Sequence, residues 1–278
     1  MTNFNGKLFN KETSLISIYN RGLNYGDALF ETMRYSAGKI IFWEDHYFRL
    51  MASMRMLRME IPMNFTMEFL QEEVQKIVKD DENALRIKII IYRKEGGKYN
   101  PTSREIEYLI TKETLKEDHY LLDVSSYEIE LYKDFAVSSG LLSGLKTTNK
   151  LINVLGSIFA EENHYQNCLL LNESKNVVEA LNANVFLVFG KTIVTPPLTD
   201  GCLNGILRKK LIGILKADPD YEMVERSVSP FELQKADEIF LTNVITGIRP
   251  VTKYRKKEFI TETSEKMIHK LNMLRLLG

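Results

Sequence analysis

The stretch SGLKTTN, residues 143–149, is a short polar turn that contains a glycine and has a lysine, Lys146, near its centre. It leads into an apolar helical repeat formed by Leu151, Val154, Leu155, Ile158 and Phe159. Because the chain has 37 Lys and Arg residues, such a lysine is most often a solvated surface residue. The alternative is an amine desolvated enough for its pKa to fall, so that it acts as nucleophile and base. The segments on either side of this turn are needed to distinguish between these two interpretations.

The residues that follow this turn predict an assembly of hairpins and helices. Residues 168–171 and 177–181 flank the polar turn 173–176, and residues 185–189 and 192–195 flank Gly190. Apolar runs separated by short polar turns are typical of β-hairpins. Beyond them, the pattern predicts a helix over 206–215, a capping box with proline at Ser229–Glu232, a strand over 239–242 and a closing helix over 264–276.

The residues before the turn predict a second mixed assembly. A hairpin is expected from residues 30–35 and 39–43 across Gly38, and two amphipathic helices follow, over 46–57 and 69–78. Residues 85–91 alternate as a strand, residues 94–101 form a turn-rich loop, and residues 106–110 form another strand. Residues 113–121 are polar and are interpreted as a linker. The sequence therefore predicts an α+β fold with two domains, 1–112 and 122–278, the second of which carries Lys146.

The overall composition limits the classes of function. Lys plus Arg equals Asp plus Glu at 37 each, so no net charge attracts the chain to nucleic acid or to an anionic membrane. No apolar run approaches the ~20 residues that a membrane-spanning helix needs. Cys168 and Cys202 are too few for a disulfide framework and are interpreted as reduced thiols. We expect a soluble, cytoplasmic protein that binds neither nucleic acid nor a membrane.

Three further features could carry chemistry. Glu179 ends an apolar strand, and a carboxylate that faces a pyridine nitrogen would keep that nitrogen protonated. Gly205 and Ile206 open a helix, whose N–H groups and dipole favour a phosphate, and Arg49 could add a bidentate contact to that phosphate. Taken singly, each is more often a solvent-facing acid, an ordinary helix start or a surface arginine. The four histidines have no metal-ligand spacing, so no metal site is predicted.

Taken in order along the chain, these segments resemble the class IV pyridoxal-phosphate (PLP) aminotransferases. Residues 20–32, NRGLNYGDALFET, are similar to the family's opening Asp-Arg-Gly…Phe-Glu-Thr block. Residues 46–50, HYFRL, resemble its His-x-x-Arg-Leu helix, and residues 145–149 resemble its lysine segment. The matching blocks continue through 178–186, 195–208 and 240–251. Six blocks in the same order extend the resemblance over nearly the whole chain.

The resemblance implies a two-domain, fold-type IV PLP enzyme, similar to D-amino-acid aminotransferase. It implies a homodimer whose active sites lie between the domains near the dimer interface. In such an enzyme Lys146 carries PLP as a Schiff base, Glu179 faces the pyridine nitrogen and Arg49 binds the phosphate. The remaining cofactor contacts would come from Gly205, Ile206, Leu207, Asn243 and Val244.

The chain departs from the family pattern at four of these positions. Asn20 replaces the usual aspartate, and Ala28 replaces the usual glycine. Leu207 and Val244 lack the hydroxyls that some amino-acid transaminases use on the phosphate. Backbone amides at Ile206, Leu207 and Val244 would then have to do more of the phosphate binding.

The reaction within this family divides into two possibilities. Residues 93–99, RKEGGKY, resemble the loop of the aminodeoxychorismate lyases, which release pyruvate and 4-aminobenzoate, a folate precursor. The turn from Asn204 and the position of Asn243 are also similar to those lyases. The lyase loop has a glycine before its tyrosine that is missing here, which favours the alternative, a branched-chain or D-amino-acid transaminase. Against a D-amino-acid transaminase, its Arg-x-His is absent from residues 96–103. Substrate contacts are expected from Phe30, Tyr92, Arg93, Lys98 and Tyr99.

A third possibility is a non-catalytic PLP-binding or interaction protein on the same fold. It predicts the loss of Lys146 or Glu179, and the chain has both residues. The lyase is therefore the first hypothesis and the transaminase the second.

Overall fold

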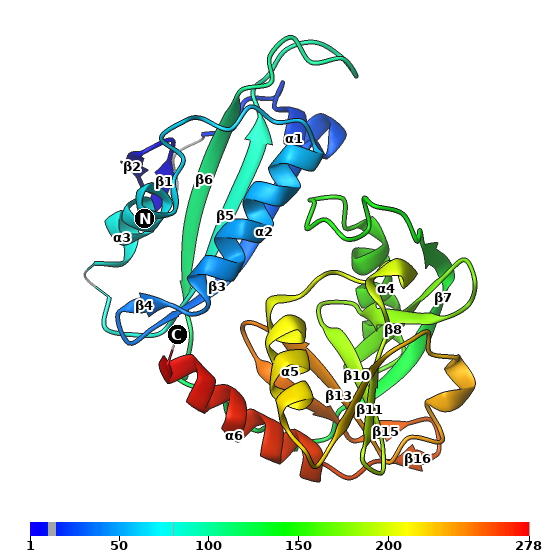
Figure 1. Cartoon of the computed structure of the whole chain (residues 1–278). Helices are drawn as coiled ribbons and strands as arrows, with labels where there is room; N and C mark the ends of the chain where they lie inside the picture. The colour runs from blue at the N-terminus through cyan, green and yellow to red at the C-terminus, as the bar shows by residue number, and fades with distance from the viewer. Residues whose placement is uncertain (11–14, 80, 278) are drawn as a thin grey trace. The chain divides into compact units, whose positions relative to one another are not determined.

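The chain divides into two compact units, each with its own sheet structure (Figure 1). The computed structural model describes residues 1–10, 15–79 and 81–277. Unit 1 consists of residues 1–119 together with 146–149, and unit 2 consists of residues 120–145 and the chain from 150 onward. The predicted linker, 113–121, begins inside the last strand of the first sheet, which runs to Thr114. Lys146 was expected in the second domain, whereas residues 146–149, here called the lysine segment, pack with unit 1.

Unit 1 is built on a six-stranded sheet in the order β2-β1-β6-β5-β3-β4. Its strands are β1 (Thr2–Phe4), β2 (Lys7–Phe9), β3 (Ala28–Ser36), β4 (Lys39–Ile40), β5 (Leu85–Arg93) and β6 (Ile106–Thr114). The long pair β3 and β5 is antiparallel from Ala28↔Tyr92 to Tyr35↔Leu85. Buried Leu85, Ile87, Ile89 and Ile91 alternate along β5, as the sequence pattern predicted for a strand with one buried face.

The helices of unit 1 are α1 (Arg21–Tyr25), α2 (Trp43–Met56) and α3 (Met67–Val78). Helix α2 packs on β3, and α3 packs on β1 and β6. The predicted hairpin across Gly38 is confirmed, but its second strand ends at Ile40. Phe42, which was predicted in that strand, has a left-handed φ of 57° and starts α2 instead.

Unit 2 contains two five-stranded sheets, β12-β11-β10-β13-β14 and β16-β15-β7-β8-β9. Their longer strands are β7 (Glu128–Val137), β8 (Asn167–Asn172), β9 (Val177–Ala180), β10 (Asn184–Phe189), β11 (Thr192–Thr195), β12 (Glu222–Glu225), β13 (Glu238–Asn243) and β14 (Gly247–Val251). The two-residue strands β15 (Lys253–Tyr254) and β16 (Lys257–Glu258) complete the second sheet. Alternate residues of both sheets form one buried core that includes Ile129, Leu131, Leu169, Leu171, Val185, Leu187, Ile239 and Leu241.

Helices cover the outer faces of these sheets. Helix α4 (Leu151–Glu162) packs on β7 and β8, where the side chains that alternate with the core set, Cys168 and Leu170, face it. Every residue of β8 is buried because both of its faces are covered. Helix α5 (Ile206–Ala217) packs on β12 and β13, and α6 (Glu262–Leu277) packs on β14 and α5.

The connection from β7 to β8 is a crossover, because these two strands are parallel. Parallel neighbours need a long connection, here α4 with the loop before it, and the lysine segment lies in that loop. The predicted hairpins β8–β9 and β10–β11 and the three predicted helices of this half are confirmed. The predicted capping box also forms, at Ser229 and Glu232, but it opens only a 3₁₀ turn, η2 (Pro230–Glu232). A second 3₁₀ turn, η1, covers Leu198–Asp200.

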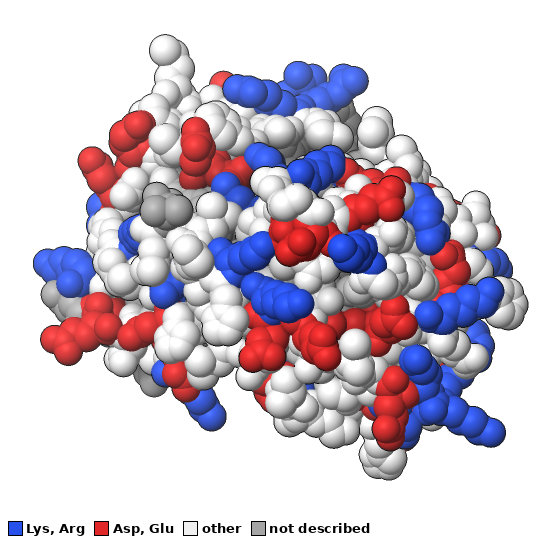
Figure 2. Space-filling view, turned by 60° about the horizontal axis from the view of Figure 1, so that its bottom comes forward, with Lys and Arg blue, Asp and Glu red and all other residues white. Residues whose placement is uncertain are grey.

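The surface of the molecule has no large region of one charge on the face shown in Figure 2, where Lys and Arg are interspersed with Asp and Glu. In the described parts of the chain, no helix is both long and apolar enough to cross a bilayer. Cys168 and Cys202 are free and buried, and burial raises the pKa of their thiols to about 11 and about 12. Both thiols are therefore protonated at neutral pH.

Candidate active site

The lysine segment is fixed through its backbone to the beginning of β3. The amide of Phe30 donates to the carbonyl of Lys146 at 2.9 Å, and the amide of Thr148 donates to the carbonyl of Ala28 at 3.1 Å. Thr147 forms an antiparallel bridge with Leu29. These bonds make residues 146–148 a short extension of the sheet of unit 1. The backbone position of Lys146 is thereby fixed.

The side chain of Lys146 lies over an aromatic ring. Its Nζ is 4.4 Å from the ring centroid of Phe30, and Lys88 Nζ is 5.1 Å from the same centroid. Lys146 and Phe30 are both half-buried. A cation over a ring face is attracted by the ring's quadrupole, so Phe30 holds the amine of Lys146 in a partly desolvated position.

Next to Phe30 on β3, Glu31 binds two side chains of α2. Arg49 Nε donates to Glu31 Oε1 at 2.7 Å, and Arg49 Nη2 donates to Glu31 Oε2 at 2.6 Å. His46 Nδ1 lies 2.8 Å from Glu31 Oε2. His46 and Arg49 are three residues apart and therefore share one face of the helix. The exposed fraction of the side chain is 2% for Glu31 and 12% for Arg49, so this bidentate ion pair is largely desolvated.

The charges of this group follow from its burial. Burial by itself would raise the pKa of Glu31, but the charge of Arg49 and the hydrogen bond from His46 outweigh it and lower that pKa to about 2. Burial also lowers the pKa of His46 below its usual 6.5. At neutral pH the imidazole is therefore neutral and donates from Nδ1 to the ionised carboxylate. Its buried Nε2 has no hydrogen-bond partner among the described residues.

In unit 2, the carboxylate of Glu179 is held from the side by neutral donors. Its Oε2 accepts from the amide of Leu203 at 2.9 Å and from Asn184 Nδ2 at 3.4 Å. Asn184 Nδ2 also donates to the carbonyl of Leu203 at 2.9 Å. Glu179 is half-buried on β9. These two neutral donors thus fix Oε2 of the carboxylate.

The start of α5 lies against the same asparagine. Gly205 is the N-cap, no side chain in the described ranges caps this helix, and its first turn contains no acidic residue. A Cβ on Gly205 would lie 2.0 Å from Asn184 Oδ1, which explains the glycine. Ile206 and Leu207 follow as buried residues. Amides at a helix start favour an anion, so this end of α5 has the chemistry of a phosphate site.

The predicted residues Asn243 and Val244 form the turn between β13 and β14. Asn243 Oδ1 accepts from the amides of Ile245 and Thr246 at 3.0 and 2.9 Å. The carbonyl of Val244 accepts from the hydroxyl of Tyr120 at 3.0 Å. The turn is therefore held from within unit 2. The side chain of Asn243 stabilises the backbone of this turn through these two hydrogen bonds.

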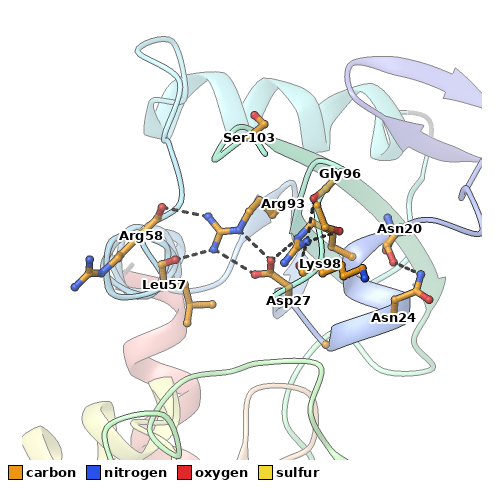
Figure 3. Close-up of polar contacts among 12 residues, drawn as sticks. Asn20, Asn24, Asp27, Leu57, Arg58, Arg93, Gly96, Lys98 and Ser103 are labelled. Carbon is orange, nitrogen blue, oxygen red and sulfur yellow. Dashed lines mark hydrogen bonds and ion pairs between the residues drawn. The ribbon is translucent and has the colours of Figure 1, made fainter. Parts of the chain in front are cut away.

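The predicted substrate residues differ in how they are placed. Phe30 lies under Lys146, and Tyr92 is buried, which raises the pKa of its phenol. Arg93 is buried, and its nitrogens donate to Asp27 and to the carbonyls of Leu57 and Arg58 (Figure 3). These contacts favour a structural role for Arg93. Lys98 and Tyr99 are exposed in the loop that follows it.

Several residues next to these had no predicted role. Glu31 and His46 were read only as parts of motifs, and neither Asp27 nor Asn184 was assigned a contact. The spacing of His46 and Arg49 on one helix face is the signal that could have paired them with an acid. Asn20, a departure from the family pattern, accepts from the amide of Leu23 at 2.9 Å and caps α1. Asparagine and aspartate are about equally good at this position, which explains why the departure is harmless.

A sequence model of the family described as "Amino-transferase class IV" matches residues 28–254. The chain belongs to this family. Class IV aminotransferases are PLP-dependent transaminases or lyases, and the protein is an enzyme of this kind. The predicted family, fold and cofactor are thus confirmed.

Relatives of the class IV chain include enzymes with different reactions. It is 26% identical to an aminodeoxychorismate lyase of Vibrio harveyi, over 85% of this chain and 86% of the relative. It is also 26% identical to a D-alanine aminotransferase of Listeria monocytogenes, over 89% and 85%. Among solved structures, the branched-chain aminotransferase of Thermoproteus uzoniensis matches with a TM-score of 0.89 at 24% identity, over 99% of this chain and 94% of that one. This last likeness shows the fold alone.

The groups described above fit the chemistry of PLP. Unit 1 offers an amine over an aromatic ring and a guanidinium held by a buried carboxylate. Unit 2 offers a carboxylate and a helix start without an acidic residue. An amine, a carboxylate and two anion-binding groups are the set that an aldehyde, a pyridine nitrogen and a phosphate require.

Proposed function

We propose that the protein is a 4-amino-4-deoxychorismate lyase, which releases 4-aminobenzoate and pyruvate and so supplies a precursor of folate. The observation that carries the proposal is the sequence of residues 93–99, which resembles the loop of these lyases and contributes most of the loop 94–101. Gly96 and Gly97 have φ of 117° and 72°. A Cβ on them would lie 2.2 Å from Thr102 Oγ1 and from the Asn100 carbonyl oxygen, respectively. The two glycines are therefore needed for the fold of this loop.

The proposed cofactor contacts are those predicted from the sequence. Lys146 would hold PLP through Nζ, Glu179 would accept a hydrogen bond from the protonated pyridine nitrogen, and Arg49 would bind the phosphate. Gly205, Ile206 and Leu207 add amides at the start of α5, and Asn243 and Val244 add the turn after β13. When bound, PLP supplies an electron sink for the carbon that loses a proton.

The chain's own residues then do the following. Once the incoming substrate amine has released its Nζ, Lys146 would remove the proton from the substrate carbon next to that amine. It would then give this proton to the three-carbon group that departs as pyruvate. Phe30 holds the amine of Lys146 in place over the face of its ring. Lys98 and Tyr99, exposed in the loop, contact the substrate, together with Phe30 and Tyr92. The release of pyruvate is driven by the aromaticity of the product.

The second candidate function is an amino-acid transaminase, which uses the same lysine but passes the amino group to a 2-oxo acid. It is favoured by the missing glycine before Tyr99 and by the equal identity to the D-alanine aminotransferase. The sequences of substrate loops diverge readily within one fold. The loop sequence therefore supports the lyase, while the equal overall identity leaves the transaminase as the alternative.

We further propose that the enzyme is a cytoplasmic homodimer. Helix α4 buries one apolar face on the sheet that contains β7 and β8. On another face of the helix, Leu151, Val154 and Ile158 are 69%, 52% and 45% exposed. Their spacing of three and four residues makes a continuous apolar stripe of the kind that protein interfaces bury. Sedimentation of the purified protein as a monomer at micromolar concentration would argue against the dimer.

The experiment that tests the function compares two reactions in the same preparation. Aminodeoxychorismate is offered alone, and D-alanine or a branched-chain amino acid is offered with 2-oxoglutarate. The lyase proposal expects 4-aminobenzoate and pyruvate in equal amounts. Glutamate formation without 4-aminobenzoate would establish the transaminase instead.

The matched variants Lys146→Ala and Lys150→Ala test the role of the lysine. Loss of the proton-transfer group is expected to lower kcat by at least about 10²–10⁴-fold in Lys146→Ala. The variant is also expected to lose the visible absorbance of the protein-bound cofactor and its fixation by borohydride. Lys150→Ala removes a nearby lysine and is expected to behave as the wild type. Borohydride fixation at a residue other than 146 would contradict the assignment.

A further inference from the structure

Asp27, which directly precedes β3, binds two arginines. Its Oδ2 accepts from Arg21 Nε and from Arg93 Nε, both at 2.9 Å, and its Oδ1 accepts from Arg93 Nη2 at 3.3 Å. The side chains of Arg21 and Arg93 are 4% and 8% exposed. Two nearly buried guanidinium groups thus share one carboxylate, so the position of each depends on Asp27.

Both arginines bind Asp27 and also donate hydrogen bonds to backbone carbonyls. Arg21 Nη1 donates to the carbonyls of Gly96 and Lys98, at 3.0 and 2.6 Å. Arg93 donates to the carbonyls of Leu57 and Arg58, at 2.8 and 3.2 Å, at the end of α2 (Figure 3). The carboxylate therefore orients an arginine that binds the loop 94–101 on one side and an arginine that binds the end of α2 on the other.

The loop that Arg21 holds has a single compact shape. Gly97 and Pro101 form a bridge, and the left-handed φ of Gly96 and Gly97 folds the chain back on itself. Tyr99 extends from the loop and is 91% exposed, and its ring centroid lies 5.8 Å from that of Tyr25. Lys98 is exposed in the same loop. The loop thus presents a cation and a phenol on a fixed backbone.

The backbone around Asp27 binds the lysine segment. Asn149 Nδ2 donates to the Gly26 carbonyl at 3.1 Å, and the Thr148 amide donates to the Ala28 carbonyl at the same distance. The residues on both sides of Asp27 are therefore bonded to the lysine segment, while its side chain is bonded to the arginine that holds the loop. Asp27 connects the loop with the segment that carries Lys146, within one unit.

We propose that Asp27 is a positioning residue for substrate specificity. Through Arg21 and Arg93 it fixes the loop 94–101 relative to Lys146, and so it sets where Lys98 and Tyr99 meet the substrate. Arg93 acts from within this network and does not contact the substrate. The inference rests on the proposed function, because it needs the loop to be a substrate loop.

The test compares Asp27→Asn and Arg21→Lys with the control Glu105→Gln. Asp27→Asn removes the charge that both arginines share. Arg21→Lys keeps a positive charge beside Asp27 but lacks the second nitrogen that binds the carbonyls of Gly96 and Lys98. Because no buried charge loses its partner, this variant is expected to fold even if Asp27→Asn does not fold. Glu105→Gln removes an exposed carboxylate that pairs with Lys94 at the edge of the same loop.

Three measurements are made on each variant: tryptic cleavage after Lys98, KM and kcat for the amine substrate, and the Kd for PLP. Loss of a charge-assisted hydrogen bond predicts about tenfold faster cleavage and about tenfold higher KM in Asp27→Asn and Arg21→Lys. In the same two variants, kcat and the Kd for PLP are expected to stay unchanged, because the loop is proposed to contact the substrate and not the cofactor. Glu105→Gln is expected to match the wild type.

Several outcomes would overturn the proposal. Cleavage and KM as in the wild type would show that Asp27 does not hold the loop. Faster cleavage with an unchanged KM would show that the loop does not contact the substrate, and a weaker Kd for PLP with unchanged KM would assign Asp27 to the cofactor. If the wild type turns over no amine at all, the proposed function fails, whereas the cleavage assay still decides whether Asp27 holds the loop.

Discussion

The two units of this enzyme hold their functional groups in different ways. In unit 1, the guanidinium of Arg49 is held by the buried carboxylate of Glu31, and Arg21 and Arg93 are held by Asp27. In unit 2, the carboxylate of Glu179 is held by the amide of Leu203 and the side-chain amide of Asn184. The three arginines of unit 1 are thus held by carboxylates, whereas Oε2 of Glu179 accepts from two neutral donors.

This difference has consequences for stability. A desolvated ion pair is costly to break, because the remaining charge stays buried without a partner. A carboxylate held by amides can be replaced by a neutral acceptor with a smaller loss. Unit 1 should therefore be sensitive to charge removal and to acid, whereas charge removal at Glu179 should affect chemistry more than folding.

The largest effect is expected for Glu31→Gln. Arg49 then keeps its charge without the carboxylate, so the free energy of unfolding is expected to fall by about 3–5 kcal/mol. Urea unfolding followed by the fluorescence of Trp43, the single tryptophan, measures this change within unit 1. The control is Glu113→Gln, which breaks the exposed pair with Arg86 and is expected to cost at most about 1 kcal/mol. Equal losses in the two variants would remove the distinction between the units.

A smaller effect, on the reaction, is expected for Glu179→Gln. The glutamine oxygen can still accept from the amide of Leu203, so the free energy of unfolding should change by only about 0.5–1.5 kcal/mol. Loss of the charge-assisted bond to the pyridine nitrogen should lower kcat by about 10- to 100-fold. Steady-state kinetics with saturating PLP measures this, with Glu173→Gln, an exposed acceptor of the Ser139 amide, as the control. A wild-type kcat in Glu179→Gln would exclude Glu179 from the reaction.

The smallest effect is an acid sensitivity that Glu31 confers. The pKa of Glu31 is lowered to about 2 in the folded protein from a usual 4.5, so its contribution is complete above pH 4.5 and is lost as the pH falls towards 2. Between pH 5.5 and 4 the wild type should lose about 1 kcal/mol more than Glu31→Gln. Burial lowers the pKa of His46, so this residue also makes the folded state less stable as the pH falls, and it does so in both proteins. Parallel pH profiles of the urea midpoint would contradict this account.

Much of the secondary structure could be predicted because it depends on local patterns. Helices α2 to α6 and the hairpins β3–β4, β8–β9 and β10–β11 all follow from periodicity and turn residues. Strand β7 was missed because Glu128, Glu130 and Lys133 interrupt its apolar residues. Helix α4 was identified, but the sequence could not say which of its apolar residues face the sheet. That choice depends on the strands it packs against.

The candidate site could be predicted as a set of residues but not as a set of contacts. The family motifs identified Lys146, Arg49 and Glu179 as site residues. Glu31 and Asp27 also lie within a motif, but the sequence assigned them no role. Their roles depend on partners 18 and 66 residues away, Arg49 and Arg93. Periodicity describes neighbours a few residues apart, so it carries no information on such pairs.

For Lys146 in particular, the sequence by itself determined that it belongs to a family segment and that a helix follows it. Only the tertiary structure decided that the segment joins β3 of unit 1 and that its amine lies over Phe30. The physical reason is that a crossover loop has no periodic pattern of its own. Its backbone donors and acceptors are satisfied by whichever strand edge the folded chain brings to it.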